Sequence, residues 1–117
     1  MKNATLILVF GIFSLTTFGQ KTLDGNWVAN SNKNTVVKIV PDNGVYSGEI
    51  ILSDNQKAVG TLLIKDALLK KDIYEGRLYS PKRKAWYDAE FEVKGNTLEI
   101  SISVGFFSKT MKWVRVK

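Results

Sequence analysis

The strongest constraint on the fold is a strict alternation of apolar and polar residues on both sides of one turn. Every second residue is apolar from 85 to 93, and again from 98 to 104. A period of two is typical of a strand that buries one face and exposes the other. Lys94, Gly95 and Asn96 separate the two runs and are typical turn residues. The pattern therefore predicts an antiparallel hairpin with one defined core face.

Similar short, β-rich segments recur along the chain between turn residues. We expect eight strands, at residues 25–29, 35–40, 45–52, 59–65, 73–79, 85–93, 97–104 and 109–116. The piece at 66–72 is less regular and fits a bulge, a short helical turn or an extended strand. Links of hairpin length leave no room for crossover helices, so the strands should form an antiparallel meander. The predicted fold class is all-β: a small eight-stranded antiparallel barrel, either filled by side chains or holding one small ligand.

The first twenty residues have the features of a secretory signal peptide. Lys2 precedes an apolar run at 4–13, and the small residues Thr17 and Gly19 occupy the positions that a signal peptidase reads. This run is too short to span a bilayer. We predict a signal peptide at 1–19 and a single barrel domain at 20–117, which places the protein in the bacterial periplasm or outside the cell. The alternative is a hydrophobic helix that stays attached as an anchor.

The composition removes several chemistries. The chain has no cysteine and no histidine, which excludes disulfides, a lipid-modified cysteine, thiolate catalysis and a Ser-His-Asp triad. We expect no catalytic residue, no cofactor, no metal site, and no transmembrane segment after signal cleavage. Asp88, Glu90 and Glu92 do share one strand face, with alternate Cα atoms ~6.6–7 Å apart. That is near the spacing of a glycosidase pair, ~5–9.5 Å between carboxyl groups, but this face should lie in solvent.

Five short motifs, taken in order, resemble those of one family. They are Gly25-Asn26-Trp27, Tyr46-Ser47-Gly48-Glu49-Ile50, Tyr74-Glu75-Gly76-Arg77-Leu78-Tyr79-Ser80-Pro81, Trp86-Tyr87-Asp88-Ala89 and Trp113-Val114-Arg115-Val116. Their order and spacing are similar to those of DUF2147, a family of small exported bacterial proteins of unknown function. The resemblance covers nearly all of the chain after the signal peptide and implies an exported β-barrel, with no known activity.

The opening Gly-x-Trp motif is also similar to that of lipocalins, in which an arginine on the last strand covers the tryptophan. This resemblance is at the level of the fold, and ligand binding is carried over only by analogy. It implies that Arg115 stacks on Trp27, a contact that contributes ~0.5–2 kcal/mol. We assign Gly25, Trp27, Trp113 and Arg115 to barrel closure.

Aromatic and basic residues near three turns are the candidate ligand contacts. Trp86 lies on the polar face of its strand, which makes it a candidate for an exposed aromatic. Phe106 and Phe107 follow Gly105 in a connection, either as an exposed apolar lip or as a packed plug of the barrel end. The full candidate set is Tyr79, Trp86, Tyr87, Phe106, Phe107, Lys82, Arg83 and Lys84. The basic members, with Lys70 and Lys71, either attract an anionic group or form an ordinary solvated turn.

These observations favour three functions in a stated order. The first is an exported, non-catalytic binding module of the bacterial envelope that holds a small or extended ligand, with an anionic group, at a barrel mouth. The second is a solid-core structural or protein-interaction module. The third is a hydrolase that uses Asp88 and Glu90. We expect an unknown small-molecule or envelope ligand as partner, and no nucleic acid, because an exported protein meets little of it.

Overall fold

The computed structural model of the chain describes residues 22–29 and 34–116. The predicted signal peptide at 1–19 lies outside the described residues. The described strands are β2 (Gly25–Val28), β3 (Val36–Asp42), β4 (Val45–Leu52), β5 (Leu62–Lys70), β6 (Ile73–Ser80), β7 (Ala85–Lys94), β8 (Thr97–Val104) and β9 (Phe107–Arg115), with one 3-10 turn, η3 (Gln56–Ala58).

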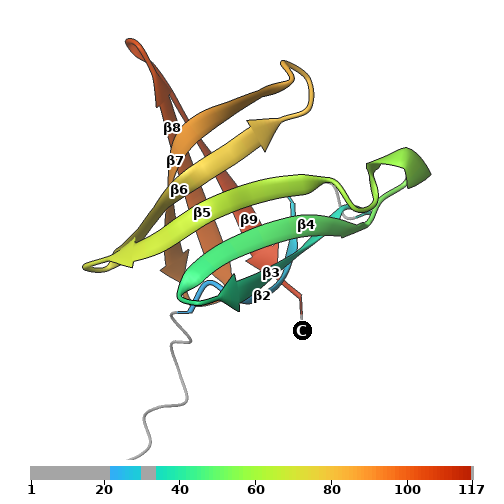
Figure 1. Ribbon diagram of the computed structural model, residues 1–117, viewed down its shortest axis with the longest axis horizontal. Coiled ribbons are helices and arrows are strands. Elements are labelled where there is room, and N and C mark those ends of the chain that lie inside the picture. The colour runs from blue at the N-terminus through green and yellow to red at the C-terminus, as the bar shows by residue number, and fades with distance from the viewer. Residues whose placement is uncertain (1–21, 30–33, 117) are drawn as a thin grey trace, which may run out of the picture.

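The eight described strands form a closed antiparallel barrel in chain order (Figure 1). Each strand pairs with the next, and β9 returns to pair with β2. This confirms the predicted all-β barrel. The alternating runs at 85–93 and 97–104 become β7 and β8, which pair directly.

Strand β5 continues through the segment whose structure the sequence left open. Lys65 pairs with Arg77 and Leu68 with Glu75, so Asp66 and Ala67 together oppose Gly76 in a β-bulge. A Cβ atom on Gly76 would lie 2.7 Å from the Ala67 Cα, so only glycine fits opposite this bulge. The irregular piece is therefore a bulged strand.

Two other strand bounds differ from the prediction. Strand β3 extends through Pro41 and Asp42, so the turn contains only Asn43 and Gly44, with φ of 58° and 84°. Two positive φ values in succession are typical of the tight turns that match strand twist. Strand β9 begins at Phe107 instead of residue 109.

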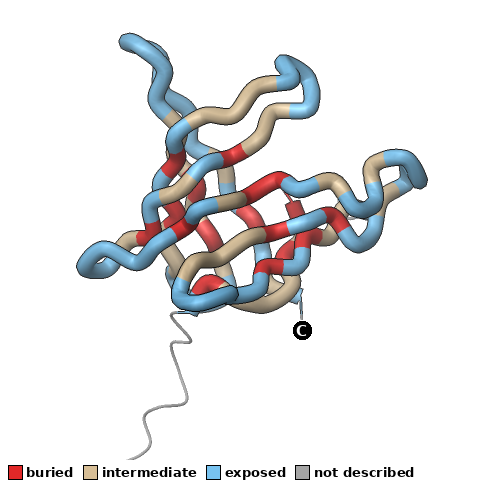
Figure 2. The backbone as a smooth tube through the Cα atoms, viewed as in Figure 1, coloured by how far each residue is buried: buried red, intermediate tan, exposed pale blue. Residues whose placement is uncertain are grey.

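The barrel has a closed end and a mouth end. In a meander, alternate connections lie at the same end. The closed end carries the turns at 43–44, 71–72 and 95–96 together with residues 22–24, and the mouth end carries the connections at 53–61, 81–84 and 105–106. Buried residues gather toward the closed end, while the hairpin tips at the mouth end project outward and are exposed (Figure 2).

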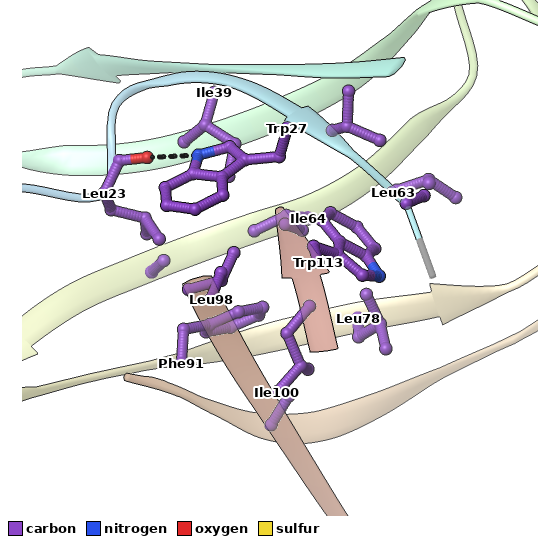
Figure 3. Close-up of a cluster of buried hydrophobic side chains, with 14 of the residues drawn as sticks. Leu23, Trp27, Ile39, Leu63, Ile64, Leu78, Phe91, Leu98, Ile100 and Trp113 are labelled. Atoms are coloured by element: carbon purple, nitrogen blue, oxygen red, sulfur yellow. Dashed lines mark hydrogen bonds between the residues drawn. The ribbon is translucent and has the colours of Figure 1, made fainter. Parts of the chain in front are cut away.

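A cluster around Trp27 seals the closed end. The Trp27 ring is fully buried, and its Nε1 donates to the Leu23 carbonyl over 3.0 Å (Figure 3). On the same ring lies Arg115, whose Cζ is 4.2 Å from the centroid. Its Nη1 and Nη2 donate to the carbonyls of Asp24 and Thr22, over 3.0 and 3.1 Å. The guanidinium thus joins the last strand to the segment before the first.

Gly25 is needed in this seal for two reasons. Its φ is 131°, a value that other residues rarely adopt, and an added Cβ would lie 2.8 Å from Arg115 Nη1. Any side chain at this position would strain the backbone and displace the guanidinium.

Replacing Arg115 with methionine should lower the free energy of unfolding by about 2–4 kcal/mol, because two charge-assisted hydrogen bonds and the stacking on Trp27 are lost. Urea denaturation measures the change. The control is Arg77→Met, which removes an exposed ion pair on the outer wall and should cost less than about 1 kcal/mol. Equal losses in both variants would contradict a sealing role for Arg115.

The buried phenol of Tyr74 predicts a loss of stability in alkali. Burial first, and then the neighbouring Tyr46, raise the pKa of Tyr74 above its ordinary value. The unfolded chain releases this proton near pH 10, while the folded chain still holds it. The contribution is therefore complete below about pH 10 and is lost as the pH rises through the higher pKa of the folded protein.

Tyr74→Phe should remove part of this alkaline decline, which urea midpoints measured from pH 8 to 11 would show. Parallel declines in the variant and the parent protein would assign the effect to other groups.

Candidate functional site

The predicted ligand contacts all lie toward the mouth end, but on three different surfaces. Tyr87 shares the inner face of β7 with the buried Ala89 and Phe91. Tyr79 and Trp86 face each other across β6 and β7 on the outer wall. The phenylalanines lie at the β8–β9 tip, and the basic residues in the β6–β7 turn. The eight residues therefore do not converge on one pocket.

The outer aromatic pair is already covered by a side chain of the protein. The rings of Tyr79 and Trp86 are 5.2 Å apart between centroids, and Lys65 Nζ lies 4.3 Å from the centroid of the Trp86 ring. Such a contact contributes about 0.5–1 kcal/mol at an exposed site. A ligand that stacked on Trp86 would have to displace Lys65, so this pair is a poor platform.

The β6–β7 turn holds three exposed cations in an ordered loop. Lys84 N donates to the Ser80 carbonyl over 2.7 Å, and Arg83 N donates to Ser80 Oγ over 3.2 Å. These bonds fix the turn that presents Lys82, Arg83 and Lys84 to solvent. A fixed cluster of cations attracts anions at the mouth end.

The β8–β9 tip exposes aromatic side chains. Val104 pairs with Phe107, which leaves Gly105 and Phe106 as the turn, with Gly105 at φ 62°. Phe106 is fully exposed and Phe107 is 55% exposed. The alternative of a packed plug is therefore wrong for Phe106, and the apolar lip is what the structure has.

An apolar strip with one cation leads from this tip into the barrel. Alternation along β9 puts Phe107, Lys109, Met111 and Trp113 on the same face. Trp113 is 2% exposed and pairs with Leu98, whereas Lys109 and Phe107 are open to solvent. The strip thus runs from water into the core.

Trp113 carries an unsatisfied donor at the inner end of this strip. Its Nε1 is buried and has no hydrogen-bond partner among the described residues. The nitrogen points away from Trp27, toward the side where Leu63 and Leu78 lie (Figure 3). Leu63 lies near the mouth-end terminus of β5, and Leu78 near that of β6. The donor therefore faces the mouth side of the core.

A buried indole N–H without an acceptor costs about 1–3 kcal/mol. The other buried atom without a described partner is Arg115 Nε, which belongs to a guanidinium whose two remaining nitrogens are both paired. Trp113 has no such compensation. The sequence assigned Trp113 to closure, but the contacts that seal the barrel come from the other three assigned residues. Alternation could have shown that Trp113 faces inward, but not where its N–H points.

The carboxylates of β7 lie outside the barrel. Asp88 and Glu90 border an open hollow of about 660 Å³ on the outer wall, together with Asp66 and Glu75. The Asp88 side chain is 93% exposed, and Arg77 Nε lies 3.8 Å from its Oδ1. Catalytic carboxylates instead use differing, partly enclosed environments. The geometry therefore adds nothing in favour of a hydrolase.

Two searches of the described residues bear on other functions. Within 22–29 and 34–116, no group of three or more His, Cys, Asp or Glu side chains is placed to hold a metal ion. Over the same ranges, no helix has the length and apolar character needed to cross a membrane.

Comparison with known proteins gives one match. The family described as "Uncharacterized protein conserved in bacteria (DUF2147)" matches residues 25–115, which include every strand of the barrel. No curated protein and no solved structure matches the chain.

Proposed function

We propose that this chain, which belongs to the DUF2147 family of uncharacterized bacterial proteins, is a non-catalytic binding module of the bacterial envelope. It takes one small, mostly apolar ligand in the mouth of its barrel. The ligand carries a hydrogen-bond acceptor at its inner end and an anionic group near the rim.

The buried N–H of Trp113 is the observation that carries this proposal. It is 2% exposed and has no acceptor among the described residues. Buried polar groups in folded proteins are almost always paired, so an unpaired donor calls for an explanation. A ligand acceptor would form a hydrogen bond that is strong because the surroundings are apolar. A solid barrel that serves only as an interaction module would leave this donor without a function.

The residues between Trp113 and the rim suit an amphiphilic ligand. Met111 and Ile102 pack against the core from β9 and β8, and Tyr87 joins them from the inner face of β7. Lys109 shares the face of Trp113 and is exposed nearer the tip. An anionic group could therefore stay in water beside a cation while the apolar part enters the barrel. An eight-stranded barrel has room for one small ligand.

Trp113→Phe separates binding from folding, because it keeps an aromatic ring and removes only the N–H group. Native mass spectrometry of protein purified without denaturation should show a stoichiometric adduct on the parent chain. The variant should bind the same ligand about 5- to 10-fold more weakly. Its unliganded stability should be unchanged or higher by about 1 kcal/mol, since an unpaired buried donor is removed.

The matched control is Trp86→Phe on the outer wall, which should leave the adduct in place. A bare parent chain would refute the proposal, as would an adduct that Trp113→Phe holds equally well. A large loss of stability in Trp113→Phe would instead make the indole structural.

A further inference from the structure

The mouth end of the barrel combines exposed apolar tips with exposed cations. We propose that this end docks on the surface of an anionic lipid bilayer, with the β8–β9 tip inserted among the lipids. This inference goes beyond ligand binding, because the rim can dock whether or not the mouth is occupied.

The β8–β9 tip is built as an apolar wedge. Phe106 lies at its apex and is fully exposed, with Phe107 at 55% and Val104 at 44% beside it. Large apolar side chains grouped at a projecting tip are unfavourable in water and mark an interaction surface. A two-residue turn holds them at the end of a paired hairpin, so the wedge is preformed.

A second apolar tip lies at the same end. The β4–β5 connection exposes Leu52, Val59 and Leu62 around the turn η3, which also bears Lys57. Asn55 Oδ1 accepts from Lys57 N over 3.0 Å and caps this turn. Two separate connections at the mouth end thus present apolar side chains in ordered backbone.

The charge of the rim is positive. Its exposed basic residues are Lys57, Lys82, Arg83, Lys84 and Lys109. Among the described residues of the three tips, the acidic one is Asp54, which accepts a hydrogen bond from Asn34 Nδ2 over 2.9 Å. The turns of the closed end differ, since Asp42, Asp72, Lys71 and Lys94 border them with both signs of charge. A bilayer with anionic headgroups matches the mouth end and not the closed end.

The arrangement of the tips favours a broad partner. The β6–β7 turn and the β8–β9 tip point outward from the barrel and diverge from each other, and the β4–β5 connection projects beside them (Figure 1). A small ligand in the mouth cannot touch all three. An extended surface can contact the two apolar tips and the basic turn at once. A fluid bilayer also accommodates an isolated phenylalanine without a shaped pocket, which a protein partner would have to supply.

Insertion is read at the tip itself with Phe106→Trp. Emission of this added tryptophan, taken as the difference from the parent protein, should shift to shorter wavelength with vesicles of equal parts phosphatidylglycerol and phosphatidylcholine. Phosphatidylcholine alone should give no shift. The full chain is used throughout, so any contribution from its N-terminal residues is common to all samples. An unshifted emission with anionic vesicles would overturn the proposal.

Vesicle co-sedimentation then tests the two components separately. Phe106→Ser combined with Phe107→Ser should weaken binding by about 10-fold or more. Lys82→Gln, Arg83→Gln and Lys84→Gln together should weaken it by about 100-fold at low salt, about 5-fold for each charge. The matched control is Leu69→Ser, which is also 55% exposed but lies near the closed end, and it should bind as the parent does.

Each outcome decides between this inference and the proposed function. Vesicle binding that survives the double serine variant would overturn docking through the tip. No binding to anionic vesicles would also overturn it, and would leave a protein partner to explain the exposed phenylalanines. Trp113→Phe should still bind vesicles, and the double serine variant should still carry the ligand adduct. Loss of one property without the other therefore shows which proposal has failed.

Discussion

The seam between the first and last strands is the contact on which the rest of the barrel depends. Strands β2 and β9 are joined by only two Cα pairs, Trp27 with Arg115 and Val28 with Val114. So short a ladder contributes little by itself. Arg115 strengthens it from inside, because its guanidinium lies on Trp27 and bonds to the carbonyls of Thr22 and Asp24. The ring of strands is thereby closed, and the core around Trp27 is shielded from water.

Sealing one end leaves the other end free for a different task. The fully buried residues lie toward the closed end, where burial supplies most of the stability of so small a domain. The hairpins extend past the core at the mouth end, and their tips contribute little to burial (Figure 2). Side chains there can be chosen for contact with other molecules. The exposed Phe106 and the unpaired N–H of Trp113 both conflict with stability, as expected of residues kept for binding.

The proposed ligand site and the proposed membrane contact share one strand. Along β9, Phe107 at the tip is followed on the same face by Lys109, Met111 and Trp113. A tip inserted among anionic lipids would place the outer end of this strip at the headgroups and its inner end at the buried indole. An amphiphilic ligand could then pass between the bilayer and the barrel without its apolar part crossing open water. The two proposals remain separable, since different residues carry them.

The sequence by itself determined the strands and their order. Alternation in β7 and β8, and turn residues such as Gly95, are local features that any fold containing those strands must respect. Contacts between distant residues were less accessible. The bulge at Asp66 depends on Gly76 across the sheet, and the cover on Trp86 comes from Lys65 on β5. The candidate ligand residues were correctly expected near one end, but only the barrel shows that they lie on separate surfaces. Above all, the direction of the Trp113 N–H was decided by the tertiary structure, because the partner of a buried polar group depends on how the whole barrel closes around it.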